Sequence, residues 1–347
     1  KGSFRTYPEK SDRLAFFVIG DWGYGSWGQY QLAKSMYKLY LEKSSSDNPI
    51  RFVLTTGDNI YADKRYSSKT VTRSSPGSGD KDSDWESKFF WPYRELLKNI
   101  PFYPSPGNHD GDESEPSGDL EVYLDNFFLS GRYYSFRFAQ LAEFFSLDST
   151  ANSTSDGRMI YSENGEQHRW LKGALEEAGR VGIPWIIPYF HHPPYTAGPR
   201  TKPSQRLNYL GKLFERLGVR TVFTGHEHNF QFSEPIGLNR IRYIVTGGGG
   251  KSFSDADLRS RPDFKGQNVQ PAMMKAARIS YWTDQFHFLH VEIQEDVMTI
   301  QVRGINKELK LRSQEGEAVN KLPRVTLAGR EGPMSAKPSS IAPSSIP

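Results

Sequence analysis

RFVLTTGDNIY, residues 51–61, is an apolar β-rich run that ends in a glycine followed by an aspartate, an asparagine and a tyrosine. Four other segments repeat this arrangement of an apolar run followed by polar side chains. They are AFFVIGD (15–21), PFYPSPGNHD (101–110), IPWIIPYFHH (183–192) and VRTVFTGHEH (219–228). Ligands of open α/β sheets bind at the carboxyl ends of the strands, so five such ends are expected to meet in one crevice.

The pattern between these runs predicts an α/β fold of mixed α+β character. Helical stripes of apolar residues cover residues 32–40, 170–178 and 207–217, and they alternate with the strand-like runs through the first 230 residues. Residues 133–148 and 286–305 are typical of antiparallel hairpins. We therefore predict a layered sandwich of two mixed β-sheets flanked by helices. A TIM barrel is disfavoured because eight regular repeats are absent.

The chain of 347 residues is expected to form a single catalytic domain over residues 1–330, with core motifs at 14–250 and a C-terminal hairpin at 286–305. The Ser- and Pro-rich residues 331–347 are expected to form a flexible tail. Residues 64–83 are polar and glycine-containing, and they directly follow the 51–61 segment. They are read either as a lid that selects substrate or as a tolerated surface insertion.

Bulk composition excludes several classes of function. A formal net charge of +4 with 24% charged residues argues against a dedicated nucleic-acid-binding surface. The chain has no cysteine, so disulfides, thiolate catalysis and cysteine-bound zinc are excluded. Any metal must therefore be held by nitrogen and oxygen donors. In addition, no apolar run is long enough to predict a membrane-spanning segment.

The polar residues at the strand ends are suited to a pair of metal ions. Carboxylate oxygen, amide oxygen and imidazole nitrogen are good ligands for iron, zinc and manganese at a hydrolytic site, and one carboxylate can bridge two cations. Asp58 is the natural candidate for that bridge. His226 and His228 are separated by one residue, a spacing that in a loop can direct the two rings to two different metals. The pattern indicates a binuclear metallohydrolase.

The motifs GDWG, GDNIY, GNHD, FHHPPY and GHEH follow one another in this chain, and YYSF and FSLDS lie between them. In this order they resemble the calcineurin-like metallophosphoesterases and, within these, the purple acid phosphatases, including the tartrate-resistant type. The resemblance covers residues 14–250 and implies the calcineurin-like metallophosphatase fold. Tyr61, three residues after Asp58, is the residue that favours the purple acid subgroup, because a tyrosine there implies a phenolate on ferric iron.

The resemblance also implies a ligand set, with Fe(III) in one position and divalent Fe, Zn or Mn in the other. Of the family pattern His-X-Pro, His191 rather than His192 is the ligand. The implied Fe(III) ligands are Asp21, Asp58, Tyr61 and His228, and the implied ligands of the divalent ion are Asp58, Asn108, His191 and His226.

The implied activity is acid hydrolysis of phosphate monoesters by attack of a metal-bound hydroxide. The substrate would be a phosphorylated small molecule or protein, and inorganic phosphate would be a product. A phosphodiesterase or nucleotide hydrolase on the same metal centre is the alternative, and a degenerate member that only binds metal is a third reading. Relatives of this kind are usually exported, so a secreted or periplasmic location is expected. The oligomeric state is left open.

Three further residues are candidates for contact with the substrate. His109, next to Asn108, is expected to hold the phosphate or to protonate the leaving oxygen. His192 either contacts substrate or is an ordinary hydrogen-bonded histidine. Purple acid phosphatases usually carry another histidine about ten residues beyond the His191 ligand, whereas this chain has Arg200 nearby. Arg200 is expected to bind phosphate, but a guanidinium cannot act as the acid.

Overall fold

The structure, a computed structural model, describes residues 6–61, 85–111, 120–151, 158–197, 206–251 and 271–327. Its helices are α1 (Trp27–Lys43), the π-helical turn η2 (Glu86–Phe90), α3 (Trp91–Leu97), α4 (Glu121–Phe127), α5 (Glu166–Arg180), α6 (Leu210–Arg216) and α7 (Pro271–Ala276). Its strands are β1 (Arg13–Ile19), β2 (Ile50–Thr56), β3 (Phe102–Ser105), β4 (Tyr134–Phe138), β5 (Ala142–Ser146), β6 (Trp185–Tyr189), β7 (Thr221–Thr224), β8 (Phe230–Ser233), β9 (Arg242–Thr246), β10 (Ile279–Thr283), β11 (Phe288–Gln294), β12 (Val297–Gly304), β13 (Lys307–Glu308), β14 (Leu311–Ser313), β15 (Ala318–Val319) and β16 (Val325–Thr326).

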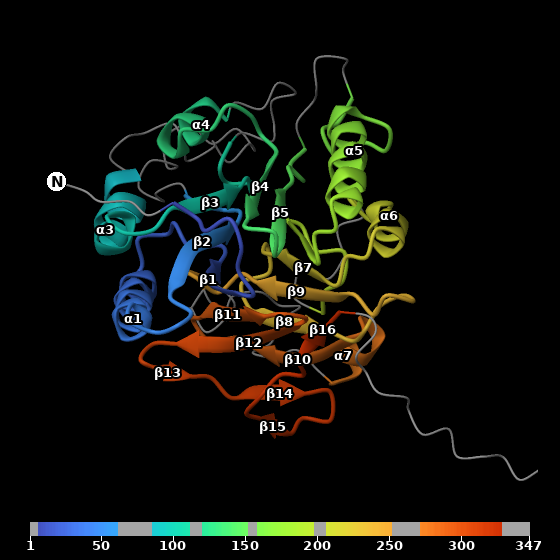
Figure 1. The fold of residues 1–347 in the computed structure, drawn as a ribbon. Coiled ribbons are helices and arrows are strands. Elements are labelled where there is room, and N and C mark those ends of the chain that lie inside the picture. Colours follow the sequence, from blue (N-terminus) through green and yellow to red (C-terminus); the bar gives the residue numbers. More distant parts are fainter. Residues whose placement is uncertain are drawn as a thin grey trace, which may run out of the picture.

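These strands form two mixed sheets, as the sequence predicts (Figure 1). The first has the order β13-β12-β11-β1-β2-β3, with β16 paired to β12. The second has the order β15-β14-β10-β8-β9-β7-β6-β5-β4. The strands β1, β2 and β3 run parallel to one another, and so do β5, β6, β7 and β9. Each sheet therefore presents a row of carboxyl ends along one edge.

The two sheets pack face to face through an aromatic core. The ring of Phe16 on β1 lies 5.3 Å from that of Phe144 on β5 and 6.3 Å from that of Phe223 on β7. Phe52 on β2 contacts Phe144 as well, with ring centroids 5.2 Å apart. All four side chains are fully buried. Apolar burial on this scale is the main favourable term that holds the layers together.

Helices cover the outer faces of both sheets (Figure 1). Apolar residues of α1, α3 and α4 pack on the first sheet, and those of α5 and α6 pack on the second. Ser26 caps α1, because its hydroxyl accepts a hydrogen bond from the amide of Gln29 at 3.1 Å. Gly218, with φ of +79°, follows the end of α6. The predicted stripes at 32–40 and 170–178 lie within α1 and α5 and are confirmed.

The third predicted helix is partly wrong, since α6 begins at Leu210 rather than at Leu207. Residues 207–209 form turns instead, and the amide of Leu210 donates to the carbonyl of Leu207 at 3.1 Å. Both predicted hairpins are confirmed: β4 pairs with β5, and β11 pairs with β12 from Phe288 to Arg303. Residues 64–83 and the tail 331–347 lie outside the described residues.

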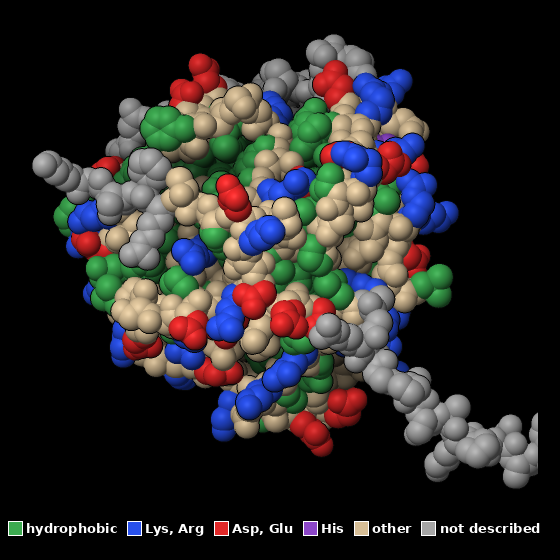
Figure 2. All heavy atoms as spheres, viewed as in Figure 1, with side chains coloured by type: hydrophobic (Ala, Val, Ile, Leu, Met, Phe, Trp, Pro, Cys, Tyr) green, Lys and Arg blue, Asp and Glu red, His purple; other side chains and the backbone are tan. Residues whose placement is uncertain are grey.

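The surface carries charges of both signs. On the face shown in Figure 2, lysine and arginine side chains lie among aspartate and glutamate side chains. Several such groups form exposed ion pairs, for example Lys98 with Glu95 at 3.0 Å and Arg180 with Glu177 at 2.7 Å. Pairs of this kind contribute little to stability because water screens them. None of the helices in the described segments is both long and apolar enough to span a membrane.

Candidate metal centre

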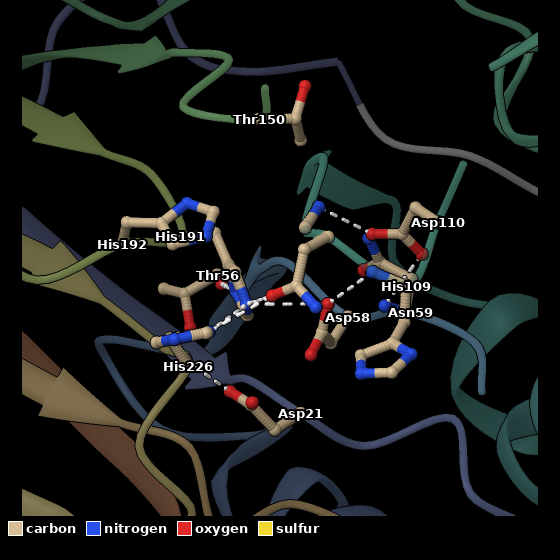
Figure 3. Close-up of polar contacts among 12 residues, drawn as sticks. Asp21, Thr56, Asp58, Asn59, His109, Asp110, Thr150, His191, His192 and His226 are labelled. Atoms are coloured by element: carbon tan, nitrogen blue, oxygen red, sulfur yellow. Dashed lines mark hydrogen bonds and ion pairs between the residues drawn. The ribbon is translucent and has the colours of Figure 1, made fainter. Parts of the chain in front are cut away.

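The five polar clusters meet between the two sheets, at the carboxyl ends of parallel strands (Figure 3). Asp21 follows β1, and Asp58 and Tyr61 follow β2. Asn108 and His109 follow β3. The second sheet supplies the histidines, with His191 and His192 after β6 and His226 and His228 after β7. The ends of three strands of the first sheet and two strands of the second therefore meet at one place, as expected from the sequence.

Unusual backbone conformations aim these side chains into the site. Asp21, Asp58 and His226 have positive φ values of 53°, 48° and 69°. A non-glycine residue in this region costs about 1–3 kcal/mol, and such residues cluster at functional sites. Gly57 also has a positive φ of 88°, and a Cβ there would lie 2.5 Å from Nδ1 of His191. Only glycine fits between β2 and that imidazole.

One group of donors surrounds the phenol oxygen of Tyr61. This oxygen lies 3.0 Å from Oδ1 of Asp21 and 2.9 Å from Oδ2 of Asp58. It lies 3.2 Å from Nε2 of His228, which is itself 3.4 Å from Oδ1 of Asp21. We call these four residues the first donor set. All four are buried.

A second donor set gathers around the amide oxygen of Asn108. This oxygen lies 3.0 Å from Nε2 of His191 and 3.0 Å from Nδ1 of His226. The two imidazole nitrogens are 3.2 Å apart. Oδ1 of Asp58 completes the second donor set at 3.3 Å from Nε2 of His191. Asp58 thus offers one oxygen to each set, which is the arrangement that a bridging carboxylate needs.

The two donor sets fit metal ions by their chemistry. Asp21 and Asp58 are completely buried carboxylates, and each directs an oxygen at the same phenol. A buried anion is costly unless a cation or hydrogen bonds compensate it. The donors are oxygen and nitrogen atoms of the kinds that bind iron, zinc and manganese. A cation within each set would satisfy lone pairs that otherwise face one another.

His191 is better placed than His192 to be a ligand. His191 contacts Asn108, Asp58 and His226, and its Nδ1 lies 2.8 Å from the carbonyl of Thr56, which orients the ring. His192 also lies near this group, with its ring 4.6 Å from that of His226. Its Nδ1, however, is held 2.9 Å from Oγ of Ser149. The expected contact of His192 with substrate stays a prediction.

Charges in the site shift the pKa values of these groups. Burial, and then the positive charges of His226, His191 and Arg206, hold the pKa of the His192 imidazole well below its usual range. Burial opposes ionisation of Asp58, but His191, followed by His109 and His226, holds the pKa of that carboxyl well below its usual range. Burial also opposes protonation of His191, yet Asp58 and Asp21 raise the pKa of that imidazole to about 9. Without metal, Asp58 and His191 therefore form an ion pair.

This ion pair makes the stability of the metal-free protein depend on pH. His191 has a folded-state pKa above its ordinary value of 6.5, so its contribution is complete below pH 6.5 and is lost as the pH rises through about 9. We expect the thermal midpoint of chelator-treated protein to fall by on the order of 5 °C across this window. Replacing His191 with glutamine should remove most of that slope. A slope that is the same in both proteins would contradict the assignment.

His109 lies next to Tyr61 of the first donor set. Its backbone amide donates to Oδ1 of Asp58 at 2.9 Å, and its ring centroid lies 4.6 Å from that of Tyr61. The side chain is partly exposed. It lies beside the first donor set, and its expected role toward the substrate stays a prediction. Arg200 lies outside the described residues, so its expected phosphate contact stays a prediction.

A glycine run brings a lysine to the rim of the site. The amides of Gly249 and Gly250 donate to the carbonyls of Gly20 and Asp21 at 3.0 and 2.9 Å. A Cβ at Gly250 would lie 2.1 Å from the carbonyl oxygen of Trp22, so the segments can approach only as glycine backbone. Lys251 follows, with Nζ 5.0 Å from the ring centroids of both Tyr24 and Tyr61. The glycine run therefore lets this segment lie against the backbone of the loop after β1.

Sequence reasoning gave no role to four residues that shape the site. Lys251 could have been found from its position after the glycine run, and Asp110 from its place in GNHD. Ser149 could have been found from its place in FSLDS, whereas Arg206 carried no local signal, because its role depends on contacts between distant segments. Asp110 accepts hydrogen bonds from the two loops that carry Asp58 and Asn108, and Ser149 and Arg206 both contact His192.

Comparisons with known proteins agree with this geometry. Residues 14–230 match the family described as calcineurin-like phosphoesterase. The chain is 27% identical over 264 residues to purple acid phosphatase 4 of Arabidopsis thaliana, covering 71% of each chain. It is 24% identical over 318 residues to tartrate-resistant acid phosphatase type 5 of Mus musculus, covering 83% of this chain and 85% of the relative.

Two solved structures share the fold at low sequence identity. Purple acid phosphatase PPD1 from yellow lupin (Lupinus luteus) seeds has a TM-score of 0.64 and 17% identity, and the match covers 93% of this chain and 58% of that one. GAP50, the anchor in the inner membrane complex of Plasmodium, has a TM-score of 0.62 and 17% identity, covering 92% and 90%. Both likenesses concern the fold. The resemblance read from the motifs is confirmed.

Proposed function

This chain belongs to the calcineurin-like phosphoesterase family, and we propose that it is a binuclear-metal acid phosphatase that hydrolyses phosphate monoesters in the manner of purple acid phosphatases. The observation that carries the proposal is the position of Asp58. One of its oxygens belongs to a set that contains the phenol of Tyr61, and the other belongs to a set with two imidazoles. Relatives named as purple acid and tartrate-resistant acid phosphatases support the same reading.

The donors suggest which metal each set would take. The phenol of Tyr61 suits Fe(III) in the first donor set, with Asp21, Asp58 and His228 as its companions. The amide and imidazoles of the second donor set suit divalent Fe, Zn or Mn. When bound, the two cations would offset the charge of the phosphoryl oxygens. They would also lower the pKa of a water molecule, so that its deprotonated form is available to attack phosphorus at low pH.

The chain's own residues supply the rest of the chemistry. Thr56 and Asn108 fix the ring of His191 from opposite sides. His109 is the imidazole that would protonate the leaving oxygen or hold the phosphate, because it lies beside Tyr61 and is partly exposed. The substrate would be a phosphorylated small molecule or protein, and inorganic phosphate the product. A secreted or periplasmic location stays a proposal that cell fractionation would test.

The visible spectrum tests the proposal most directly. Purified protein should contain about two metals per chain and show a tyrosinate-to-Fe(III) absorption band. Tyr61→Phe keeps the ring but removes the donor oxygen, so we expect the band to disappear while the protein stays folded. A parallel assay should show faster hydrolysis of a phosphate monoester than of a diester.

Two results would count against this proposal. A colourless protein that holds two metals and hydrolyses esters would refute the ferric assignment and favour a diesterase. A protein purified with ample iron, zinc and manganese that nevertheless binds none of them would instead indicate a scaffold without enzymatic activity.

A further inference from the structure

Arg206 reaches the edge of the second donor set from a segment outside the five polar clusters. Its Nη1 lies 3.1 Å from Nε2 of His192 and donates to the carbonyl of Ser149 at 2.9 Å. The guanidinium stands over the ring of Tyr161, with its carbon 5.5 Å from the ring centroid. The side chain is partly buried. Three segments distant in sequence therefore hold this charge in one place.

The guanidinium of Arg206 lies against the ring of His192. Its Nη1 is 3.1 Å from Nε2 and 3.5 Å from Nδ1, so it lies beside both nitrogens of that ring. Nδ1 of His192 is in turn 2.9 Å from Oγ of Ser149, and the backbone amide of His192 donates to the same oxygen at 3.1 Å. The guanidinium brings a permanent positive charge to this side of the site.

The guanidinium is one imidazole away from the second donor set. A ring nitrogen of His192 lies within 4.8 Å of ligand atoms of His191 and His226. The rings of His192 and His226 are 4.6 Å apart.

We propose that Arg206 is a specificity-determining residue that binds an oxygen of the substrate's phosphoryl group, and of product phosphate, beside the second donor set. The inference rests on the proposed function, because it concerns the substrate of that site. Arginine presents its N–H groups in a planar fork that matches two oxygens of a phosphate, and the charge strengthens each hydrogen bond. Ser149 and His192 hold this fork at the site before substrate arrives, which lowers the entropic cost of binding.

Arg206 acts on binding and not on proton transfer. A guanidinium keeps its proton at any working pH, so it cannot serve as the acid for the leaving group. Residues 193–225 contain no histidine that could do so. Replacing Arg206 should therefore weaken the binding of every phosphate ester by a similar factor. The dependence of the rate on the pKa of the leaving group should not change.

Binding of inorganic phosphate to the metal-loaded full-length chain tests this assignment without turnover. We expect Arg206→Gln to raise the calorimetric Kd for phosphate by about 10- to 100-fold, as for loss of a hydrogen bond to a charged group. KM for a monoester should rise by a similar factor, with metal content unchanged. Arg206→Lys keeps the charge without the fork and should give an intermediate Kd. Arg216→Gln, on α6 and 61% exposed, is the matched control and should stay within about twofold.

The outcomes separate this inference from the proposed function. A Kd in Arg206→Gln within about threefold of the unmodified chain, with both metals retained, would overturn it. A changed leaving-group dependence with an unchanged Kd would overturn it too, because Arg206 would then act on the chemistry. If Arg206→Gln fails to fold, the Lys variant decides. A chain that binds phosphate through Arg206 but hydrolyses no monoester would support this inference and contradict the proposed function. The same titration on Arg200→Gln tests the contact expected there.

Discussion

Replacing Asp58 with asparagine should reduce hydrolysis of a phosphate monoester by about a thousandfold or more, because several kcal/mol of transition-state stabilisation depend on the pair of cations. Asparagine keeps the shape of the side chain but removes its charge. Its amide nitrogen has no lone pair for a metal, so only one of the two donor sets can keep its oxygen. We expect at most one tightly bound metal per chain, measured by elemental analysis after gel filtration.

The same variant should also alter the metal-free protein. His191 would lose the carboxylate that, with Asp21, raises its pKa, so the loss of stability between pH 6.5 and about 9 should become smaller. Asp125→Asn, on the exposed side of α4, is the control that changes one carboxylate away from the site. Two metals per chain and a kcat/KM within about tenfold of the unmodified protein would show that Asp58 is not the shared ligand.

Replacing Asp110 with asparagine should lower the free energy of unfolding by about 2–5 kcal/mol, because two buried N–H groups would each lose their acceptor. Asp110 is almost completely buried and accepts four hydrogen bonds. Its Oδ1 accepts from the amides of Asn59 and Ile60 at 2.8 and 3.2 Å. Its Oδ2 accepts from the side chain of Asn59 at 2.8 Å and from the amide of Gly107 at 2.7 Å.

The ionisation state of Asp110 does not change this prediction. Burial, and then the charge of Asp58, raises the pKa of the Asp110 carboxyl to about 8 in the metal-free site. A carboxyl group has an acceptor oxygen at both positions whether it is ionised or protonated, whereas the amide nitrogen of asparagine only donates. In the Asp110→Asn variant, the NH2 group of the new side chain would therefore point at N–H groups that need an acceptor.

Urea unfolding measures the effect, and metal analysis should show weaker binding in both donor sets, since Asp110 joins the loops that carry Asp58 and Asn108. Asp47→Asn, at a side chain that is 91% exposed, should stay within about 0.5 kcal/mol. If the free energy of unfolding of Asp110→Asn equals that of the control, the four hydrogen bonds are not holding these loops.

The sequence predicts the strand ends and the polar residues that follow them because both depend on local patterns. An apolar run such as 15–19 is recognisable as a buried strand, and the polar residue after it must lie at the strand's end. The order of strands in the sheets is not local. That β11 lies antiparallel between β12 and β1 depends on pairing between Phe16 and Val291, which no short window contains. The helices α3 and α4, with seven residues each, are too short to show a clear period.

The details of the site divide in the same way. The resemblance implies that His191 rather than His192 is the ligand, but the contacts that place the His191 ring against Asn108 and Asp58 join segments distant in the sequence. The roles of Ser149 and Arg206 depend on where the loops after β5 and before α6 meet. An arginine outside any motif gives no signal of such a meeting in the sequence.

The two donor sets draw their residues from both layers of the sandwich, so an ion bound in either set would link the two sheets. Asp21, Asp58, Tyr61 and Asn108 follow strands of the first sheet, and the three histidines of the donor sets follow strands of the second. A cation that joins residues so far apart in the sequence closes long loops of the unfolded chain at once. The edge where catalysis is proposed would then also be the edge where metal ions link the two sheets. Loss of metal would therefore abolish the reaction and weaken the packing of the two sheets at the same time.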